Sequence, residues 1–282
     1  MLQPHGPPRV PPAKIPGILW YKLGPSGLSN QSHEWTDTCI EKNPTYRPEF
    51  MTDTSADDYV MRTFALRPEI PETYLALTIP ILKADMLRYL LLFDQGGIWM
   101  DLDVSCEDTP IDDWIPEHYR HNASLVVGWE FDAGWEEPFV RQFATWTIMS
   151  RPRSTHMSMV VDDIIEGLRS ASLKHGVPIA NLTLDMTGDV VDMTGPRRFT
   201  SGVLKSLGES LGESVSIEDI KGLREPKLVG DVLIMPGRAF ASSSNKYEDK
   251  EGLTPPLVTH HYAGSWKNEF GGEQTEMDNG QS

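Results

Sequence analysis

The stretch DQGGIWMDLDV, from Asp94 to Val104, joins a glycine pair, an apolar run and two carboxylates. The apolar run after the glycines predicts a buried β-strand, although aspartate is depleted in strands. Because side chains alternate between the faces of a strand, Asp101 and Asp103 are expected to point the same way, about 6–7 Å apart. Two carboxylates so placed repel each other. A divalent cation would turn that repulsion into a binding site, because hard cations take oxygen ligands.

The segment before this strand, residues 80–95, has the clearest helical periodicity in the chain, and the glycine pair would end the helix. Asp85 and Arg88 lie three residues apart and therefore on one helical face. Their neighbours are apolar, and a charged residue in such surroundings is usually paired or functional. The turn folds the helix back onto the strand, so this pair could converge with Asp101 and Asp103. The simpler interpretation is a surface ion pair beside a solvated acidic strand end.

The composition limits the classes of partner. The 282-residue chain carries a formal net charge of −16, which argues against nucleic acid or an anionic membrane surface as partner. No apolar run is long enough to span a bilayer. The two cysteines, Cys39 and Cys106, lack the spacing of a zinc site. A disulfide between them is left open, and we expect Cys106 to be a packed thiol.

Strand-like and helix-like segments alternate along the chain, which predicts an α/β fold with a largely parallel sheet. We expect a flexible proline-rich lead-in over residues 1–13, a single domain over 14–270 and a disordered polar tail over 271–282. The expected strands lie within residues 14–23, 46–51, 98–104, 124–131, 231–240 and 257–266. The expected helices lie within residues 29–43, 80–95, 137–150, 156–171 and 196–210.

The block KADMLRYLLLFDQGGIWMDLDV, residues 83–104, resembles the central signature of the family 32 glycosyltransferases. In that signature a small residue, Asp, two residues and Arg precede a Gly-Gly turn and a DxD strand. Further blocks, among them DMTGPRRFT and HHYAGSWK, match the family in order, and the resemblance covers roughly residues 14–268. It is greatest to the fungal initiation-specific α-1,6-mannosyltransferases. Trp20 and Tyr21 depart from the family's usual His-Gln, and residues 241–256 differ from the subgroup's loop, which bears on acceptor choice.

The resemblance implies a GT-A fold: one α/β domain with a mixed, mostly parallel central sheet flanked by helices. It implies that Asp101, Asp103 and His260 hold a manganese or another divalent ion, with His261 as the competing ligand. The catalytic set would be Asp85, Arg88, Asp101 and Asp103. The residues expected to contact the nucleotide-sugar donor are Asp85, Arg88, Asp101, Gly264, Ser265, Trp266 and Lys267.

The resemblance also implies an activity: metal-dependent transfer of mannose from GDP-mannose to a glycan or glycoprotein acceptor. The product would be the α-1,6 bond that initiates the N-glycan outer chain, formed with retention of configuration. The expected location is the Golgi lumen, with the family's membrane anchor absent from this chain and a complex with other Golgi glycosyltransferases as a further expectation. Three sequons, at Asn30, Asn122 and Asn181, fit a lumenal protein. The alternatives are an inositol-phosphoceramide acceptor, a UDP-sugar donor, or a carbohydrate-binding protein without catalysis.

Several other residues have two interpretations each. Trp99 and Trp146 are expected in the core rather than as sugar platforms, and His156 in the core or on the acceptor side. Arg197 and Arg198 are expected at the surface, with an acceptor contact as the alternative. No acidic residue in the matched blocks is free to act as a nucleophile, which favours front-face departure over double displacement. The competing nucleophiles lie in the stretch EFDAGWEEP: Glu130, Asp132, Glu136 and Glu137.

Overall fold

The computed structural model describes residues 14–249 and 251–263. At its centre is a sheet with strand order β2-β1-β3-β7-β5-β9-β8, and β6 pairs with β5 beside this path. The pairs β1–β2, β1–β3 and β5–β9 are parallel, while β7 runs antiparallel to both of its neighbours. The predicted α/β architecture with a mixed, mostly parallel sheet is therefore confirmed. The strands are β1 (Ile18–Lys22), β2 (Arg47–Met51), β3 (Gly97–Met100), β4 (Val104–Cys106), β5 (Leu125–Phe131), β6 (Gln142–Phe143), β7 (Thr147–Ser150), β8 (Lys227–Val229), β9 (Val232–Met235) and β10 (Val258–His260).

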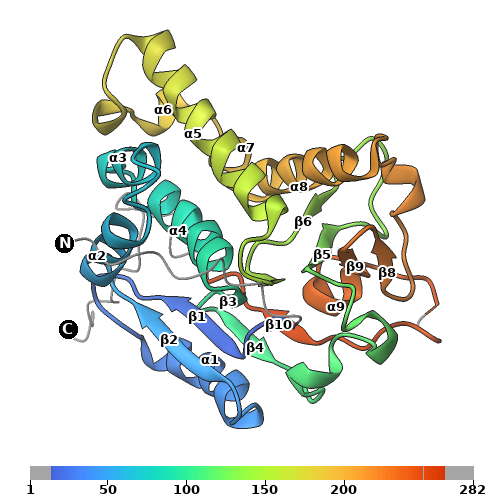
Figure 1. The fold of residues 1–282 in the computed structure, drawn as a ribbon. Helices are drawn as coiled ribbons and strands as arrows, with labels where there is room; N and C mark the ends of the chain where they lie inside the picture. The colour runs from blue at the N-terminus through green and yellow to red at the C-terminus, as the bar shows by residue number, and fades with distance from the viewer. Residues whose placement is uncertain (1–13, 250, 264–282) are drawn as a thin grey trace, which may run out of the picture.

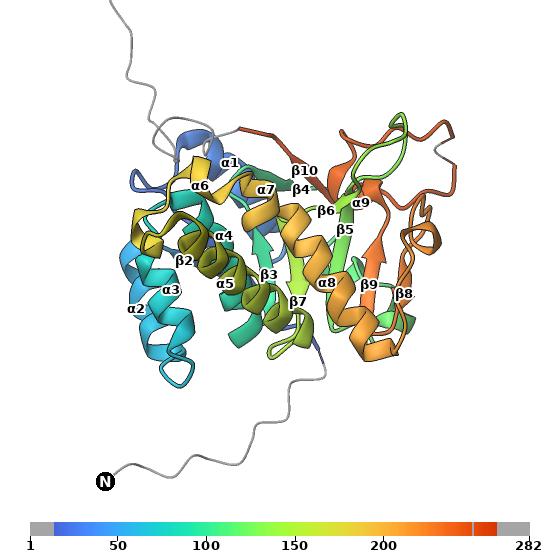
Figure 2. The ribbon, with the colours of Figure 1, turned by 90° about the horizontal axis from the view of Figure 1, so that it is seen from above.

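Helices cover both faces of the sheet (Figure 1). On one face α4, α5 and α8 lie side by side, as the view from above also shows (Figure 2). On the other face lie α1, α9 and the two-stranded sheet of β4 and β10. The helices are α1 (Asn30–Lys42), α2 (Asp53–Thr63), α3 (Glu69–Ala76), α4 (Pro80–Asp94), α5 (Thr155–His175), α6 (Leu184–Thr187), α7 (Val190–Met193), α8 (Pro196–Leu211) and α9 (Gly237–Ala241).

Alternation along the strands divides the buried apolar residues into two cores. Trp99 of β3 and Ile148 of β7 point to the side of α4, α5 and α8. Their neighbours Ile98, Met100 and Met149 point to the side of α1, α9 and β4. Each sheet face thus buries apolar side chains, as a sheet between two layers requires. No helix in the described part of the chain is long and apolar enough to cross a membrane.

The turn from α4 into β3 depends on two glycines with positive φ, 66° at Gly96 and 103° at Gly97. A Cβ at Gly96 would lie 2.6 Å from the backbone nitrogen of Pro152, and a Cβ at Gly97 would lie 2.8 Å from the carbonyl oxygen of Ile18. Other residues are therefore excluded both by φ and by space. This turn leads from the end of α4 directly into β3, an interior strand of the sheet, as the sequence predicts.

Two predicted elements are wrong. The strand expected over residues 98–104 is interrupted, because β3 ends at Met100 and a turn, in which the Val104 N–H donates to the Asp101 carbonyl, precedes β4. The helix expected over residues 137–150 is instead β6, a connecting loop and β7. The apolar residues of this segment alternate between the two sheet faces. They therefore repeat with the period of two that is typical of a strand, and not with the helical period that the prediction used.

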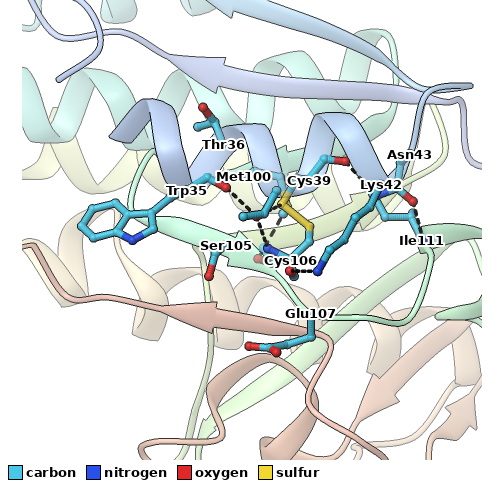
Figure 3. Close-up of a disulfide and its surroundings, with 12 residues drawn as sticks. Trp35, Thr36, Cys39, Lys42, Asn43, Met100, Ser105, Cys106, Glu107 and Ile111 are labelled. Carbon is cyan, nitrogen blue, oxygen red and sulfur yellow. Dashed lines mark hydrogen bonds between the residues drawn. A yellow bond between two sulfur atoms is a disulfide. The ribbon is translucent and has the colours of Figure 1, made fainter. Parts of the chain in front are cut away.

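Cys39 of α1 and Cys106 of β4 form a disulfide (Figure 3), so the expectation of a packed thiol at Cys106 is wrong. Both cysteines are buried. Around the bond, the Lys42 ammonium donates to the Cys106 carbonyl at 3.0 Å, and the Cys106 N–H donates to the Thr38 hydroxyl at 2.8 Å. The bridge therefore fixes α1 against β4, three residues beyond Asp103.

Candidate active site

Asp101, Asp103 and His260 come together at one end of β3 and each offers a possible metal ligand, with the ligand atoms within 4.8 Å of one another. The two aspartates lie in the turn between β3 and β4. His260 ends β10, which pairs antiparallel with β4 so that His260 lies opposite Val104. The His260 Nε2 is 3.3 Å from the Asp103 Oδ1. Residues 157 positions apart in the sequence are thus joined by a two-stranded sheet.

The chemistry of these side chains fits a divalent cation. Adjacent ligands of a small octahedral ion lie about 3 Å apart, since such an ion binds oxygen at about 2.1 Å. Two donors, the Trp99 indole N–H and an Arg88 N–H, both contact Oδ1 of Asp101, at 2.6 and 3.1 Å, so Oδ2 is left to face a cation. The His260 ring is fixed in place because it stacks on the buried Trp146 with centroids 4.2 Å apart.

The charge state of Asp103 also suits a cation. Partial burial raises the pKa of this carboxyl. The His260 side chain and the Ala263 N–H, which donates to it at 3.0 Å, lower the pKa by more than burial raises it. The pKa of Asp103 therefore lies below its usual value. Asp103 is therefore ionised at neutral pH. A carboxylate and an imidazole that already face each other offer an oxygen and a nitrogen ligand to a metal ion.

Asp85 and Arg88 of α4 are buried next to this cluster and not at the surface, each with only 5% of its side chain exposed. The Arg88 guanidinium donates to Asp85 at 2.9 Å and to Asp101 at 3.1 Å. It also lies over the Trp99 ring at 5.0 Å. The structure thus brings Asp85, Arg88, Asp101 and Asp103 together, and Arg88 joins the helical pair to the cluster.

Burial raises the pKa of the Asp85 carboxyl, and the Arg88 charge and a hydrogen bond from Thr194 oppose that rise. The Thr194 hydroxyl donates to Asp85 Oδ2 at 2.8 Å, and the Tyr89 hydroxyl donates to the Thr194 carbonyl at 2.9 Å. Sequence reasoning missed Thr194, although the block DMTGPRRFT that contains it was singled out. The only local signal is a polar residue two positions before Pro196, which begins α8.

His261 faces away from the cluster. Its Nε2 lies 2.8 Å from the Ser105 hydroxyl, and its ring stacks on Trp35 of α1 at 4.3 Å. Of the two histidines, His260 is therefore the one beside Asp103. The four residues Gly264, Ser265, Trp266 and Lys267, predicted to contact the donor, lie outside the described residues.

The remaining candidates are distributed over the fold. His156 is buried in the first turn of α5 and contacts Asp231 at 2.9 Å, beside the N-terminal end of β9. Arg197 forms an ion pair with Asp192, and Arg198 donates to the Asp192 carbonyl. Trp99 and Trp146, as predicted, are buried in the core, yet both contact the cluster.

The four carboxylates proposed as competing nucleophiles are in different surroundings. Glu136 and Glu137 are exposed. Asp132 is buried and accepts from the Gly222 N–H at 2.8 Å. Glu130 is buried at the end of β5 and accepts from the Gln142 amide at 2.7 Å. Asn245 donates to the Glu130 carbonyl at 2.9 Å, and the neighbouring Ser244 contacts Tyr262, so Glu130 is connected to the segment beside Tyr262.

Comparison with known proteins places this site in a class. Residues 29–121 match the model of a family described as a glycosyltransferase sugar-binding region containing a DXD motif. That range includes Asp101 and Asp103, the DXD pair of this chain, together with Asp85 and Arg88. Residues 29–121 therefore carry a glycosyltransferase sugar-binding region with a DXD motif.

Over most of its length, the chain is similar to the fungal initiation-specific α-1,6-mannosyltransferases. It is 31% identical to that of Schizosaccharomyces pombe over 91% of this chain and 65% of that protein. It is 27% identical to that of Candida albicans over 84% of this chain and 67% of that protein. The chain thus spans about two thirds of the length of these relatives.

Two further similarities are more limited. A Saccharomyces cerevisiae mannosyl phosphorylinositol ceramide synthase is 31% identical over 34% of this chain and 25% of that protein. Among solved structures, the PaToxG glycosyltransferase is similar with a TM-score of 0.43 and 15% identity, over 71% of this chain and 75% of that one.

Proposed function

We propose that this protein is a metal-dependent, retaining mannosyltransferase that moves mannose from GDP-mannose to a glycan acceptor, forming the α-1,6 bond that initiates the N-glycan outer chain. One observation carries the proposal: Arg88 bridges Asp85 to Asp101 within a cluster that also holds Asp103 and His260. This cluster offers both a cation site and a buried guanidinium, which together can recognise a nucleoside diphosphate in a strongly acidic protein. The relation to the fungal mannosyltransferases supports mannose as the transferred sugar.

Each residue has a role that its contacts support. Asp101, Asp103 and His260 would hold a divalent ion, manganese in this proposal, which when bound neutralises charge on the leaving diphosphate. Arg88 is held rigidly by two carboxylates, so its planar fork is oriented before the donor binds. Asp85 fixes Arg88, and its oxygens each retain a lone pair for a sugar hydroxyl. Lys267 and Trp266 are proposed to contact the phosphates.

Retention of configuration can follow either of two routes. In front-face departure, the leaving phosphate oxygen takes the proton of the acceptor hydroxyl while the glycosidic bond to the phosphate breaks and the new bond forms on the same face. In double displacement, a carboxylate attacks first and is then replaced. Among the carboxylates of the stretch EFDAGWEEP, we take Glu130 as the candidate nucleophile, because it is buried and its bond with Gln142 orients it. We favour the front-face route, and a covalent glycosyl adduct on Glu130, trapped with a poor acceptor and detected by mass spectrometry, would contradict it.

An inositol-phosphoceramide acceptor is the second candidate. The local match to a mannosyl phosphorylinositol ceramide synthase supports it, but that match covers about a third of the chain, whereas the match to the N-glycan enzymes covers most of it. A UDP-sugar donor and a non-catalytic carbohydrate-binding protein remain as alternatives for the test below.

A screen of donors against acceptors tests the proposal. The purified protein would be incubated with GDP-mannose or UDP-sugars, and with a high-mannose N-glycan or inositol phosphoceramide, in manganese or in EDTA. We expect α-1,6-mannosylated N-glycan from GDP-mannose in manganese only. Transfer to the lipid, or from UDP-sugars, would select an alternative, and no transfer under any condition would favour a binding protein.

A lumenal location is part of the proposal. The Cys39–Cys106 disulfide is typical of oxidising compartments, and the asparagines of all three sequons are exposed. Both features fit the Golgi lumen. Association with other Golgi glycosyltransferases stays a prediction, which co-purification from fungal membranes would test.

A further inference from the structure

Two exposed aromatic rings lie beside the acidic cluster. Trp135 is 46% exposed, and no other tryptophan in residues 14–249 and 251–263 is exposed to this extent. Its ring packs edge-on against Phe131 with centroids 4.8 Å apart, and its indole N–H donates to the Ser244 carbonyl at 2.7 Å. The ring is therefore fixed at its edge, and much of its surface remains open to solvent.

Tyr262 is the second ring, also 46% exposed. It lies edge-on to His260 at 4.1 Å and to Trp146 at 5.7 Å, and its hydroxyl bonds to the hydroxyl of Ser244. Its φ of 51° is in the left-handed region, which non-glycine residues adopt rarely and at an energetic cost. Ser244 thus contacts both Trp135 and Tyr262, and Tyr262 connects this pair to the cluster.

The segment that carries Ser244 is rigidly attached to the loop of Trp135. The Asn245 side chain accepts from the backbone N–H groups of Asp132 and Ala133 at 2.8 and 2.9 Å. It also donates to the Glu130 carbonyl at 2.9 Å, and the Lys246 N–H donates to the Ala133 carbonyl at 2.9 Å. The two loops therefore hold their relative positions before any ligand binds, which lowers the entropic cost of binding.

The same segment lines a cavity of about 460 Å³, to which Ser242, Ser243, Asn245, Lys246 and Tyr247 contribute together with Arg238 and Pro256. The hydroxyl groups of Ser242 and Ser243 and the ammonium group of Lys246 suit a ligand that carries many hydroxyls. The two aromatic rings, which the same segment contacts through Ser244, suit the apolar C–H face of a pyranose. A saccharide presents both kinds of surface at once, whereas a lipid tail offers no partner to the polar groups.

We propose that Trp135, Tyr262 and the segment 242–247 form the acceptor subsite, which binds an oligosaccharide by ring stacking on the two aromatics and by hydrogen bonds in the adjoining cavity. The inference rests on the proposed function, since the saccharide bound here is the one that receives the sugar. The subsite adjoins His260, so an acceptor stacked on Tyr262 reaches the donor held at the cluster.

The test is calorimetric titration of the protein with a released high-mannose oligosaccharide, both alone and with saturating GDP and manganese. No sugar is transferred in either arm, so the measurement is independent of catalysis. We expect Trp135→Ala to weaken binding at least tenfold and Trp135→Phe, which keeps a ring, to restore part of the affinity. Val140→Ala, at a 57% exposed position of the same loop, is the matched control and should bind like the wild type.

Kinetics supply a second measurement. Trp135→Ala should raise KM for the acceptor while leaving KM for the donor and the melting temperature unchanged. Wild-type affinity in Trp135→Ala, or no oligosaccharide binding by the wild type in either arm, would overturn the subsite. Oligosaccharide binding that requires Trp135, in a protein that transfers no mannose from any donor, would support the subsite and reject the proposed function.

Discussion

At the scale of single residues, Asp101 and Asp103 differ in their partners, and mutation should separate their roles. Asp101 accepts hydrogen bonds from Arg88 and Trp99, whereas Asp103 faces His260 and the Ala263 N–H. We expect Asp101→Ala and Asp103→Ala both to reduce transfer about 100-fold or more, by loss of charge stabilisation. Only Asp101→Ala should also lower stability markedly, by about 1–3 kcal/mol, because it leaves buried donors unpaired.

The measurements for this pair are turnover and urea unfolding. The control is Asp108→Ala, a fully exposed carboxylate two residues after Cys106, which should change neither. Turnover near the wild-type value in Asp103→Ala, with EDTA present, would contradict a metal at this site.

Arg88 is the residue whose replacement should be least tolerated. Its guanidinium is almost fully buried between Asp85 and Asp101 and lies over Trp99. Arg88→Ala should cost about 3–5 kcal/mol, because it leaves a buried carboxylate without its partner. Arg88→Lys should recover part of the stability but little of the activity, because an ammonium cannot contact both carboxylates as a planar fork does.

Urea unfolding and kinetics separate these effects, with Arg62→Lys as control, because Arg62 is exposed and forms an ion pair with Asp58 of the same helix. Full activity in Arg88→Lys would place Arg88 in a structural role.

At the scale of elements, the disulfide fixes α1 against β4 and so supports the turn that carries the aspartates. It closes a loop with a sequence separation of 67, which in the chain-entropy description contributes about 4 kcal/mol. We expect Cys39→Ser with Cys106→Ser to lose about this much stability and much of the activity, because β4 also pairs with the strand of His260.

Urea midpoints with and without a reducing agent measure this effect. The double variant serves as the control. The chain has two cysteines and the variant replaces both, so the urea midpoint of the variant should not respond to the reductant. If the urea midpoint of the wild type also did not change on adding the reductant, that result would contradict a stabilising disulfide.

A second element contact should make stability depend on pH. Asp231, before β9, contacts His156 of α5 and the Ser124 hydroxyl. The hydrogen bond with His156, opposed by partial burial and helped by Ser124, lowers the pKa of Asp231 to about 2. Because the folded pKa is below the unfolded value, the contribution is present above about pH 4 and is lost as the pH falls toward 2.

The Asp231 side chain is 46% exposed, so solvent screening limits the effect to on the order of 1 kcal/mol. Asp231→Asn should therefore destabilise at pH 6 by this amount and match the wild type near pH 2, in urea titrations at each pH. Asp219→Asn, at an exposed position, should follow the wild-type curve. A constant difference at all pH values would exclude this titration as the cause.

The elements also show what the sequence can and cannot predict. α4, the glycine turn and β3 follow from local periodicity and from the φ values that glycine permits, so the Asp85–Arg88 face was placed correctly. Thr194 and the Cys39–Cys106 pairing depend on contacts between segments distant in sequence, which no local pattern encodes. The helix predicted over residues 137–150 failed because packing on both sheet faces, not propensity, decides that segment.

At the scale of the whole molecule, the site gathers residues from α4, the β3–β4 turn, the α7–α8 junction and β10. A ligand that contacts all of them binds the folded chain and not the unfolded one. The protein is also strongly acidic, with a net charge of −16, so binding of the proposed nucleoside diphosphate would depend on Arg88 and a cation. Ligand binding and metal binding should therefore be coupled, each strengthening the other.

Thermal unfolding tests that coupling. At 100 times its Kd, GDP with manganese should stabilise the fold by about 2.7 kcal/mol, which corresponds to a rise in Tm of about 5–10 °C for a chain of this size. GDP in EDTA should give a much smaller rise, because the phosphates would then face uncompensated carboxylates. UDP with manganese should also give a smaller rise in Tm than GDP with manganese, if the protein recognises the guanine base as proposed. Asp103→Ala is the matched control and should abolish the metal-dependent part. Equal shifts for GDP in manganese and in EDTA would contradict a cation at Asp101, Asp103 and His260 while leaving nucleotide binding itself intact.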